Sequence, residues 1–170
     1  MSAIDTVADL MVLAARTAPK AVGEDYIVIE TLRQEQMQSL GEAMIAYGER
    51  EGQTNFDRDG RNVIRSQGVV LIGIKEAPAL GADCSACGEP NCLLTNTYDG
   101  VFKGPQCAIR MLDLGIAIGS AVKVASMLNV DNRIMYRVGV VAREEGLIDA
   151  DVVMGIPLSA TGKNIFFDRG

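Results

Sequence analysis

The chain has 170 residues, 48% of them apolar, which suits one domain over residues 1–170 and is too short for two domains of usual size. Its 16 basic residues are scattered among 22 acidic ones and the net charge is −6, which argues against nucleic-acid binding because phosphate contacts need clustered Lys and Arg. The apolar segment 114–128 is interrupted by Ser120 and Lys123, and the start MSAIDTVADL has no secretory pattern, so we expect a soluble cytoplasmic protein that does not span a membrane.

The amino-terminal segment predicts a helix that ends near Pro19. Ser2 and Asp5 have the spacing of a capping box, and apolar residues follow on one helical stripe, namely Ile4, Val7, Met11 and Ala14. After a loop, the β-branched run 26–29 predicts a short buried strand.

A second helix is predicted next, with Thr31 and Gln34 as its capping residues. Its apolar stripe has helical spacing and consists of Met37, Leu40, Met44 and Tyr47. We expect this helix to end at Gly52. A polar stretch, 53–61, then leads to a short helix through Val63.

The run 69–74 is continuously apolar, which is the pattern of a strand covered on both faces and therefore of a central sheet. The later segment 109–128 predicts a helix that is apolar nearly all round and buried on several sides, with Gly115 and Gly119 permitting close neighbours. Residues 130–146 fit both a helix and a strand, and Gly146 as a terminator favours the helix. Segment 151–157 predicts a last strand, with Pro157 limiting the ladder beyond it.

All four cysteines of the chain lie in one segment, with the spacing Cys84-x2-Cys87-x4-Cys92-x14-Cys107. Thiolate is the ligand that iron-sulfur clusters and structural zinc share, so this spacing predicts a four-thiolate metal centre. The residues between the first three cysteines are small and turn-forming. Cys107 follows Pro105, which we expect at the first position of a helix, so that the fourth thiolate lies near a helix N-terminus.

Three kinds of site remain open for these cysteines. Structural zinc accepts four thiolates but more often uses two separated pairs, whereas here three ligands cluster and one stands apart, which favours an iron-sulfur cluster. Disulfides or unliganded thiols are the third alternative, disfavoured because nothing in the sequence indicates export to an oxidising compartment.

The C-x2-C-x4-C segment with a distant fourth cysteine resembles the four-cysteine [4Fe-4S] domain of corrinoid iron-sulfur proteins and of the B subunit of ion-pumping electron-transport complexes. This resemblance covers about 25 residues and implies that Cys84, Cys87, Cys92 and Cys107 hold one [4Fe-4S] cluster.

Most of the chain is weakly similar to the nitroreductase fold. The likeness lies in the segment 14–19 leading into an Ile-Val-rich strand, the glycine-bearing apolar helix, and the segment 153–157. It implies an α+β sandwich, a central sheet flanked by helices, with the four-cysteine segment 84–107 inserted. It also implies a homodimer with a helical interface and an FMN at the subunit boundary. Together, the two resemblances match the family of ferredoxin-domain-containing proteins.

If FMN binds, the cations available for its phosphate are Arg16, Lys20, Lys163 and Arg169. Flavin enzymes of this fold usually begin with an arginine-rich segment, and this chain has no basic residue before Arg16. The sequence therefore favours the cluster over the flavin, because a fold can persist when its site is lost.

The chain contains no histidine, which removes the commonest general base and the Ser-His and Cys-His nucleophilic pairs. Redox chemistry is the function class that remains. The first hypothesis is an electron-transfer protein or redox subunit that passes electrons to a flavin or to a protein partner. The alternatives are a non-catalytic module with a structural cluster or zinc, and an FMN-dependent oxidoreductase.

Overall fold

A four-stranded antiparallel sheet lies at the centre of the structure, a computed structural model that describes residues 2–92 and 97–167. The strand order is β1-β2-β6-β5, and a separate two-stranded hairpin pairs β3 with β4. The strands are β1 (Ile27–Leu32), β2 (Gly68–Ile74), β3 (Tyr98–Asp99), β4 (Lys103–Gly104), β5 (Asp131–Asn132) and β6 (Val152–Ser159).

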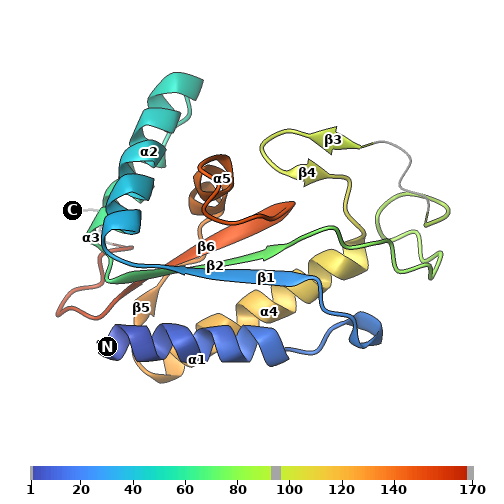
Figure 1. Cartoon of the computed structure of the whole chain (residues 1–170), viewed down its shortest axis with the longest axis horizontal. Helices are drawn as coiled ribbons and strands as arrows, with labels where there is room; N and C mark the ends of the chain where they lie inside the picture. The colour runs from blue at the N-terminus through green and yellow to red at the C-terminus, as the bar shows by residue number, and fades with distance from the viewer. Residues whose placement is uncertain (1, 93–96, 168–170) are drawn as a thin grey trace.

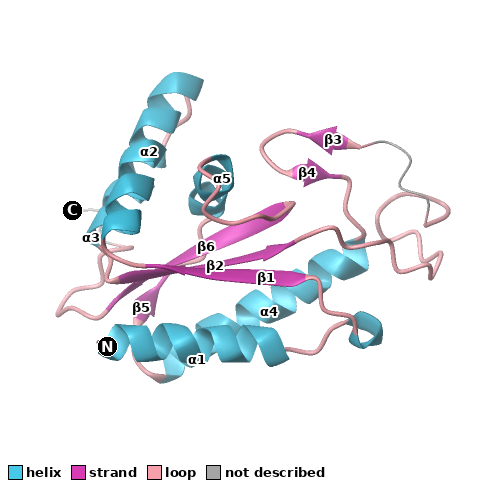
Figure 2. Cartoon of the chain, in the orientation of Figure 1, coloured by secondary structure: helices cyan, strands magenta, loops and turns pink. Residues whose placement is uncertain are grey.

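Helices cover both faces of this sheet (Figures 1 and 2). One layer is formed by α1 (Ala3–Thr17) and α4 (Ala108–Met127), which pack against each other. The other layer is formed by α2 (Glu35–Glu51), α3 (Phe56–Arg65) and α5 (Tyr136–Glu144). A 3₁₀ turn, η1 (Ala21–Gly23), connects α1 to β1. The structure therefore confirms the predicted α+β sandwich.

Every residue of β2 is buried, as its unbroken apolar run predicts. Alternate side chains point to opposite faces, so Val70 and Ile72 join the core under α1 and α4, while Val69 and Leu71 join the core under α2, α3 and α5. The sheet thus divides the apolar side chains into two cores, one on each face.

Two of the predicted helices form as their patterns indicate. Helix α1 has a capping box, in which the Asp5 backbone N–H donates to Ser2 Oγ at 3.1 Å and the Ser2 backbone N–H donates to the Asp5 carboxylate at 2.7 Å. Helix α2 buries the predicted stripe that includes Met37 and Met44 and ends at Gly52, which adopts a positive φ of 62°. Local pattern and tertiary packing agree in both helices.

Two boundary predictions are wrong. Thr31 caps no helix: β1 continues to Leu32 because Thr31 pairs with Val70 of β2, and α2 begins at Glu35 after Gln34, whose side chain makes no capping bond. Pro105 is not the first residue of α4, because Cys107 is the N-cap and Ala108 begins the helix. Strand pairing and the loop before α4 override the local signals.

Strand β6 continues through Pro157 and for two residues beyond it. The expectation that Pro157 limits strand pairing beyond this point is therefore wrong. The N–H of Gly155 donates to Met135 on the β5 side of the strand, and residues two apart present their backbone nitrogens to the same side. The nitrogen of Pro157 therefore also faces β5, where pairing starts only at Leu158. Its missing N–H costs no bond to β2.

The ambiguous segment 130–146 contains both kinds of structure: a two-residue strand, β5, and the helix α5, with Gly146 at a positive φ of 67° after it. Helix α4 is less buried than expected. Leu112 and Met127 are 60% and 71% exposed, and an added Cβ at Gly115 or Gly119 would meet no heavy atom of the described chain within 4 Å. One face of α4 is therefore uncovered within a single chain.

No helix in residues 2–92 and 97–167 combines the length and the apolar composition needed to cross a bilayer.

Gly139 tests the contact between α5 and β6, because an added Cβ would lie 1.9 Å from the carbonyl oxygen of Val153. We expect Gly139→Ala to lower the free energy of unfolding by about 2 kcal/mol or more, since backbone atoms have to move apart. Urea denaturation measures the change. The matched control is Gly162→Ala, where the described residues leave open space, and it is expected to stay within about 0.5 kcal/mol of the parent.

Candidate metal centre

The cysteine segment leaves the sheet where β2 ends and returns at the start of α4 (Figure 1). The four thiols are free of disulfides, and their burial differs: Cys84 and Cys87 are exposed, Cys92 is half-buried and Cys107 is buried. Three thiols thus belong to a surface loop, and one is anchored in the body of the protein.

Cys107 is the N-cap residue of α4, as the sequence predicts for the fourth thiolate. Burial raises the pKa of its thiol, but the backbone N–H groups of Arg110, Leu80 and Ile109, together with the charge of Arg110, outweigh that effect and hold the pKa below its ordinary value. The helix terminus and the start of the cysteine loop therefore both favour a thiolate at this position.

The loop that carries the other three cysteines is closed at its base by a reciprocal pair of contacts. The backbone N–H of Asp83 donates to Cys92 Sγ at 3.2 Å, and the backbone N–H of Cys92 donates to Asp83 Oδ1 at 3.0 Å. Within the loop, the Gly88 N–H donates to the Ser85 carbonyl at 3.0 Å, which makes a tight turn around Cys87. Cys92 therefore lies next to the residue that precedes Cys84.

The sulfurs do not form a closed ligand shell: in the described part of the chain, no three Cys, Asp or Glu side chains lie together in a group that could hold a metal ion. Leu80, whose backbone N–H contributes to the lowered pKa of the Cys107 thiol, is four residues from Cys84, so the backbone between them spans at most about 14 Å. Four free thiols, three on a short loop and one fixed beside that loop, fit a thiolate-ligated metal in the chemistry of their donors.

Of the cations predicted for an FMN phosphate, only Arg16 and Lys20 lie together among the described residues, because both pair with Asp25, at 2.7 Å and 3.8 Å. Arg16 donates to Asp25 and to the Ile27 carbonyl, both at 2.7 Å, and the ammonium of Lys20 donates to three carbonyl oxygens at the end of α1. Lys163 follows β6, at the opposite end of the sheet from these two residues. Arg169 lies outside the described residues.

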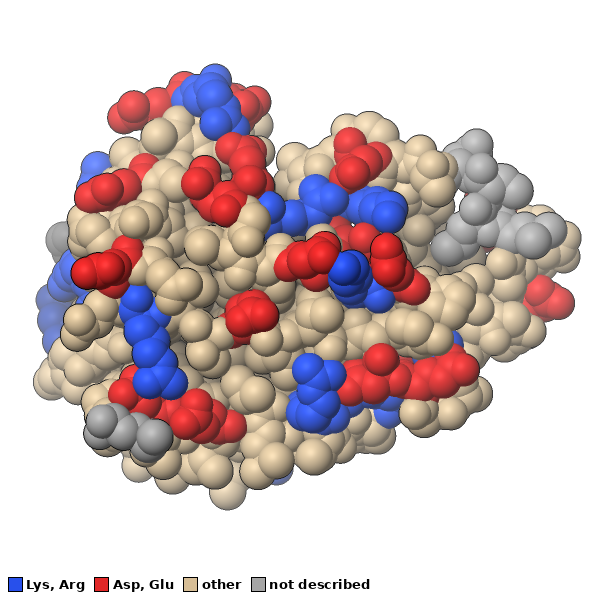
Figure 3. Space-filling view, viewed as in Figure 1, with Lys and Arg blue, Asp and Glu red and all other residues tan. Residues whose placement is uncertain are grey.

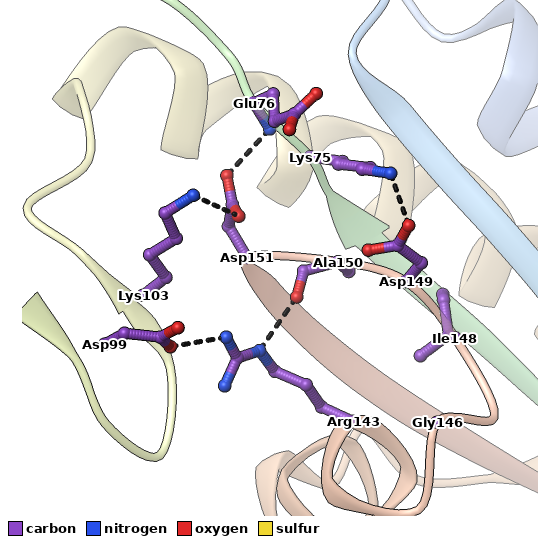
Figure 4. A pocket seen from close by; sticks show the side chains of 10 residues that line it. All are labelled: Lys75, Glu76, Asp99, Lys103, Arg143, Gly146, Ile148, Asp149, Ala150 and Asp151. Atoms are coloured by element: carbon purple, nitrogen blue, oxygen red, sulfur yellow. Dashed lines mark hydrogen bonds and ion pairs between the residues drawn. The ribbon is translucent and has the colours of Figure 1, made fainter.

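A charged cavity of about 500 Å³ lies between the hairpin and the segment before β6 (Figure 4). It was not predicted from the sequence. Acidic and basic side chains of the hairpin, of β2's end and of the segment before β6 alternate around it, and Figure 3 shows the same mixture of signs on this face of the molecule. Its ion pairs join Lys75 to Asp149, Lys103 to Asp151 and Arg143 to Asp99.

Arg143 fastens the hairpin that follows the cysteine loop. Its guanidinium donates to the Asp99 carboxylate at 2.6 Å, to the Gly100 carbonyl at 3.1 Å and to the Ala150 carbonyl at 2.9 Å. These bonds connect α5, the hairpin and the segment before β6. The residues are far apart in the sequence, so only the fold reveals this arrangement.

The comparisons with known proteins bear on the family of the chain and on its fold. A family model described as "Uncharacterized protein containing a ferredoxin domain (DUF2148)" matches residues 103–169, a region that includes Cys107. A protein of Archaeoglobus fulgidus, itself described as an uncharacterized protein, is 49% identical over 163 residues, which cover 94% of this chain and 88% of that protein. This chain belongs to the ferredoxin-domain family.

Solved nitroreductases share the fold of this ferredoxin-domain protein. A nitroreductase with bound FMN from Desulfitobacterium hafniense has a TM-score of 0.62 at 13% identity, covering 96% of this chain and 80% of that one. The FMN-dependent nitroreductase NfnB from Mycobacterium smegmatis, solved with NADPH, has a TM-score of 0.64 at 10% identity, covering 93% and 78%. At these identities the likeness establishes the nitroreductase-like fold alone.

We expect Arg143→Met to release the hairpin without unfolding the sheet, because it removes charge-assisted bonds worth about 1.5–3 kcal/mol each. The readout is amide hydrogen exchange at Lys103, whose N–H donates to the Asp151 carbonyl at 2.9 Å, and exchange should accelerate more than about tenfold. Arg50→Met is the control, since Arg50 pairs with Glu51 and Glu144 at the surface. Equal exchange in both variants would show that Arg143 does not hold the hairpin.

Proposed function

We propose that this ferredoxin-domain protein holds one [4Fe-4S] cluster through Cys84, Cys87, Cys92 and Cys107, and that it serves in electron transfer or as a redox subunit. In this proposal residues 1–170 form a single domain, and 84–107 are an insertion between β2 and α4. A cluster held by four thiolates supplies one-electron transfer when bound, because it keeps no open coordination position for a substrate.

The observation that carries the proposal is the position of Cys107. Cys107 is buried at the N-cap of α4, and the backbone N–H of Leu80, at the start of the loop that bears the other cysteines, helps to hold the pKa of its thiol below the ordinary value. N–H groups directed at sulfur stabilise negative charge there, which suits both a thiolate and an anionic cluster. The loop cysteines can then approach this fixed point from the solvent side.

The family description supports iron-sulfur chemistry, and the free thiols agree with a reducing compartment, which we propose to be the cytoplasm. On the face shown in Figure 3, acidic and basic side chains are interspersed, whereas a surface that binds nucleic-acid phosphates carries clustered basic side chains. We propose a redox protein as the partner of the cluster, with no nucleic acid or membrane involved.

Anaerobic reconstitution is expected to load about four iron and four sulfide ions per chain, giving a brown protein whose EPR signal appears after dithionite reduction. Cys92→Ser should lose most of this iron and the reducible spectrum, because three thiolates remain. Asn91→Ala, in the same exposed loop, is the control and should load like the parent.

Two outcomes would contradict this proposal. Zinc in place of iron, with unfolding of Cys92→Ser and no redox signal in the parent, would assign the cysteines to a structural metal in a non-catalytic module. A Cys92→Ser variant that keeps both its fold and the full reducible spectrum would remove Cys92 from the ligand set.

A second candidate, an FMN-dependent oxidoreductase, is favoured by the fold shared with FMN-binding nitroreductases. Arg16 and Lys20 already satisfy groups within the chain, which weakens the case for a phosphate site there. A yellow preparation that releases FMN on denaturation would support this candidate, whereas a brown one without flavin would oppose it.

We also propose that the chain is a homodimer whose interface includes the exposed face of α4. Leu112 and Ile116 are exposed there, beside Gly115 and Gly119, and α1 extends the apolar surface with Leu13, which is 58% exposed.

An apolar groove adjoins this face. It is lined by Leu10, Leu13, Ala14, Thr17, Val124, Met127 and Leu128. Contiguous apolar surface of this kind is typical of interfaces, and the glycines would let a second helix approach closely.

Leu112→Glu is expected to weaken the dimer roughly 100-fold, because it would bury an unpaired carboxylate between subunits. Light scattering after size-exclusion chromatography measures the mass. Val101→Glu also introduces a carboxylate, at a 51% exposed position in the hairpin on the other side of the sheet, and should leave the dimer intact. A parent that elutes with the mass of one chain would contradict the dimer.

A further inference from the structure

Arg110 is the most unusual side chain near the proposed metal centre, because it is a guanidinium with only 2% of its side chain exposed. Arginines are rarely buried so fully unless their charge and donors find partners. It lies in the first turn of α4, three residues after Cys107. A buried cation is thus held in the turn that begins at the buried cysteine.

The donors of Arg110 bind two separate parts of the chain, the segment before the cysteines and the turn η1 with its C-cap. Its Nε donates to the Pro78 carbonyl at 3.2 Å, at the start of the segment that leads to the cysteines, and another nitrogen donates to the Ala21 carbonyl at 3.3 Å in η1. A third donates to the carboxylate of Glu24. The guanidinium also lies over the ring of Tyr26, 4.8 Å from its centroid.

A buried carboxylate completes this arrangement. Asp113 lies one turn further along α4, and its Oδ1 accepts a bond from the Ala21 N–H at 2.8 Å. Its other oxygen is 3.6 Å from the Arg110 guanidinium and has no hydrogen-bond partner among the described residues. Arg110 therefore neutralises a carboxylate that would otherwise be buried alone, and both residues hold η1 against α4.

We propose, on the basis of the cluster assigned above, that Arg110 is a positioning residue of the metal centre and that its buried charge raises the reduction potential of the cluster. The positioning follows from its bond to Pro78, which ties the beginning of the cysteine segment to the helix turn of Cys107. The electrostatic effect follows because reduction adds one negative charge to the cluster, and a nearby cation away from water stabilises the reduced state more than the oxidised one.

Glu24 adjusts this effect from the surface. Its carboxylate contacts Arg110, yet half of the Glu24 side chain is exposed, so the residue can be changed without disturbing a core. Removing the negative charge of Glu24 leaves the positive charge of Arg110 less compensated, and the potential should then move in the positive direction. Variants of Arg110 and Glu24 therefore have opposite expected signs.

The test is a redox titration of the anaerobically reconstituted protein, followed by EPR. We expect Arg110→Met to shift the midpoint to more negative values by roughly 59 mV, which is a tenfold change in the equilibrium constant for one electron. Arg110→Lys keeps the charge but loses the planar set of donors, so it should shift less than Arg110→Met. Glu24→Gln should shift the midpoint positively, and it serves as the test if Arg110→Met does not fold.

Glu42→Gln is the matched control, because it removes one exposed carboxylate from α2 in the opposite helical layer and should leave the midpoint unchanged. If the parent carries a reducible cluster but Arg110→Met and Glu24→Gln have the same midpoint potential as Glu42→Gln, the role of Arg110 is overturned while the proposed function stands. A parent that takes up no reducible cluster would overturn the proposed function itself.

Discussion

The pairing of β2 with β6 is the constraint on which the rest of the structure depends. All seven residues of β2 are buried, all seven pair with β6, and 69–74 also pair with β1. Because β2 has a helical layer on each face, its alternate side chains serve two separate cores. The layers approach the sheet closely where side chains are absent, as at Gly139 beside Val153. Register along β2 therefore determines which of its side chains face each helical layer.

The candidate metal centre follows from this arrangement. The chain leaves β2 at one end of the sheet and re-enters the body at Cys107, so the cysteine segment is bounded by a fully buried strand and a buried helix terminus. Rigid elements at both ends limit how far the loop thiols can move from Cys107. Arg110 and Arg143 fasten the flanking segments, one toward α1 and the other toward β6. An exposed loop is thus held by buried or partly buried guanidinium groups.

Sequence patterns predicted those features that depend on near neighbours in the chain. The capping box at Ser2, the stripe of α2 and the unbroken run of β2 each have a local physical cause, and all three are confirmed. Predictions failed where a distant partner decides the outcome, as for Thr31, which pairs with Val70. A signal that could have indicated the buried ion pair was the presence of Arg110 and Asp113 one turn apart near the start of a mostly apolar helix.

By itself, the sequence predicted the helices and the buried central strand and placed four thiols at the spacing of a metal centre, because apolar periodicity and thiol spacing are properties of a short stretch of chain. It also predicted that the fourth thiol lies near a helix N-terminus, and Cys107 is the N-cap residue of α4. Only the tertiary structure decided which charges are buried, which face of α4 lacks cover and which carbonyls Arg110 and Arg143 reach. Those features arise where segments far apart in the sequence come into contact, and a local sequence pattern does not specify such contacts.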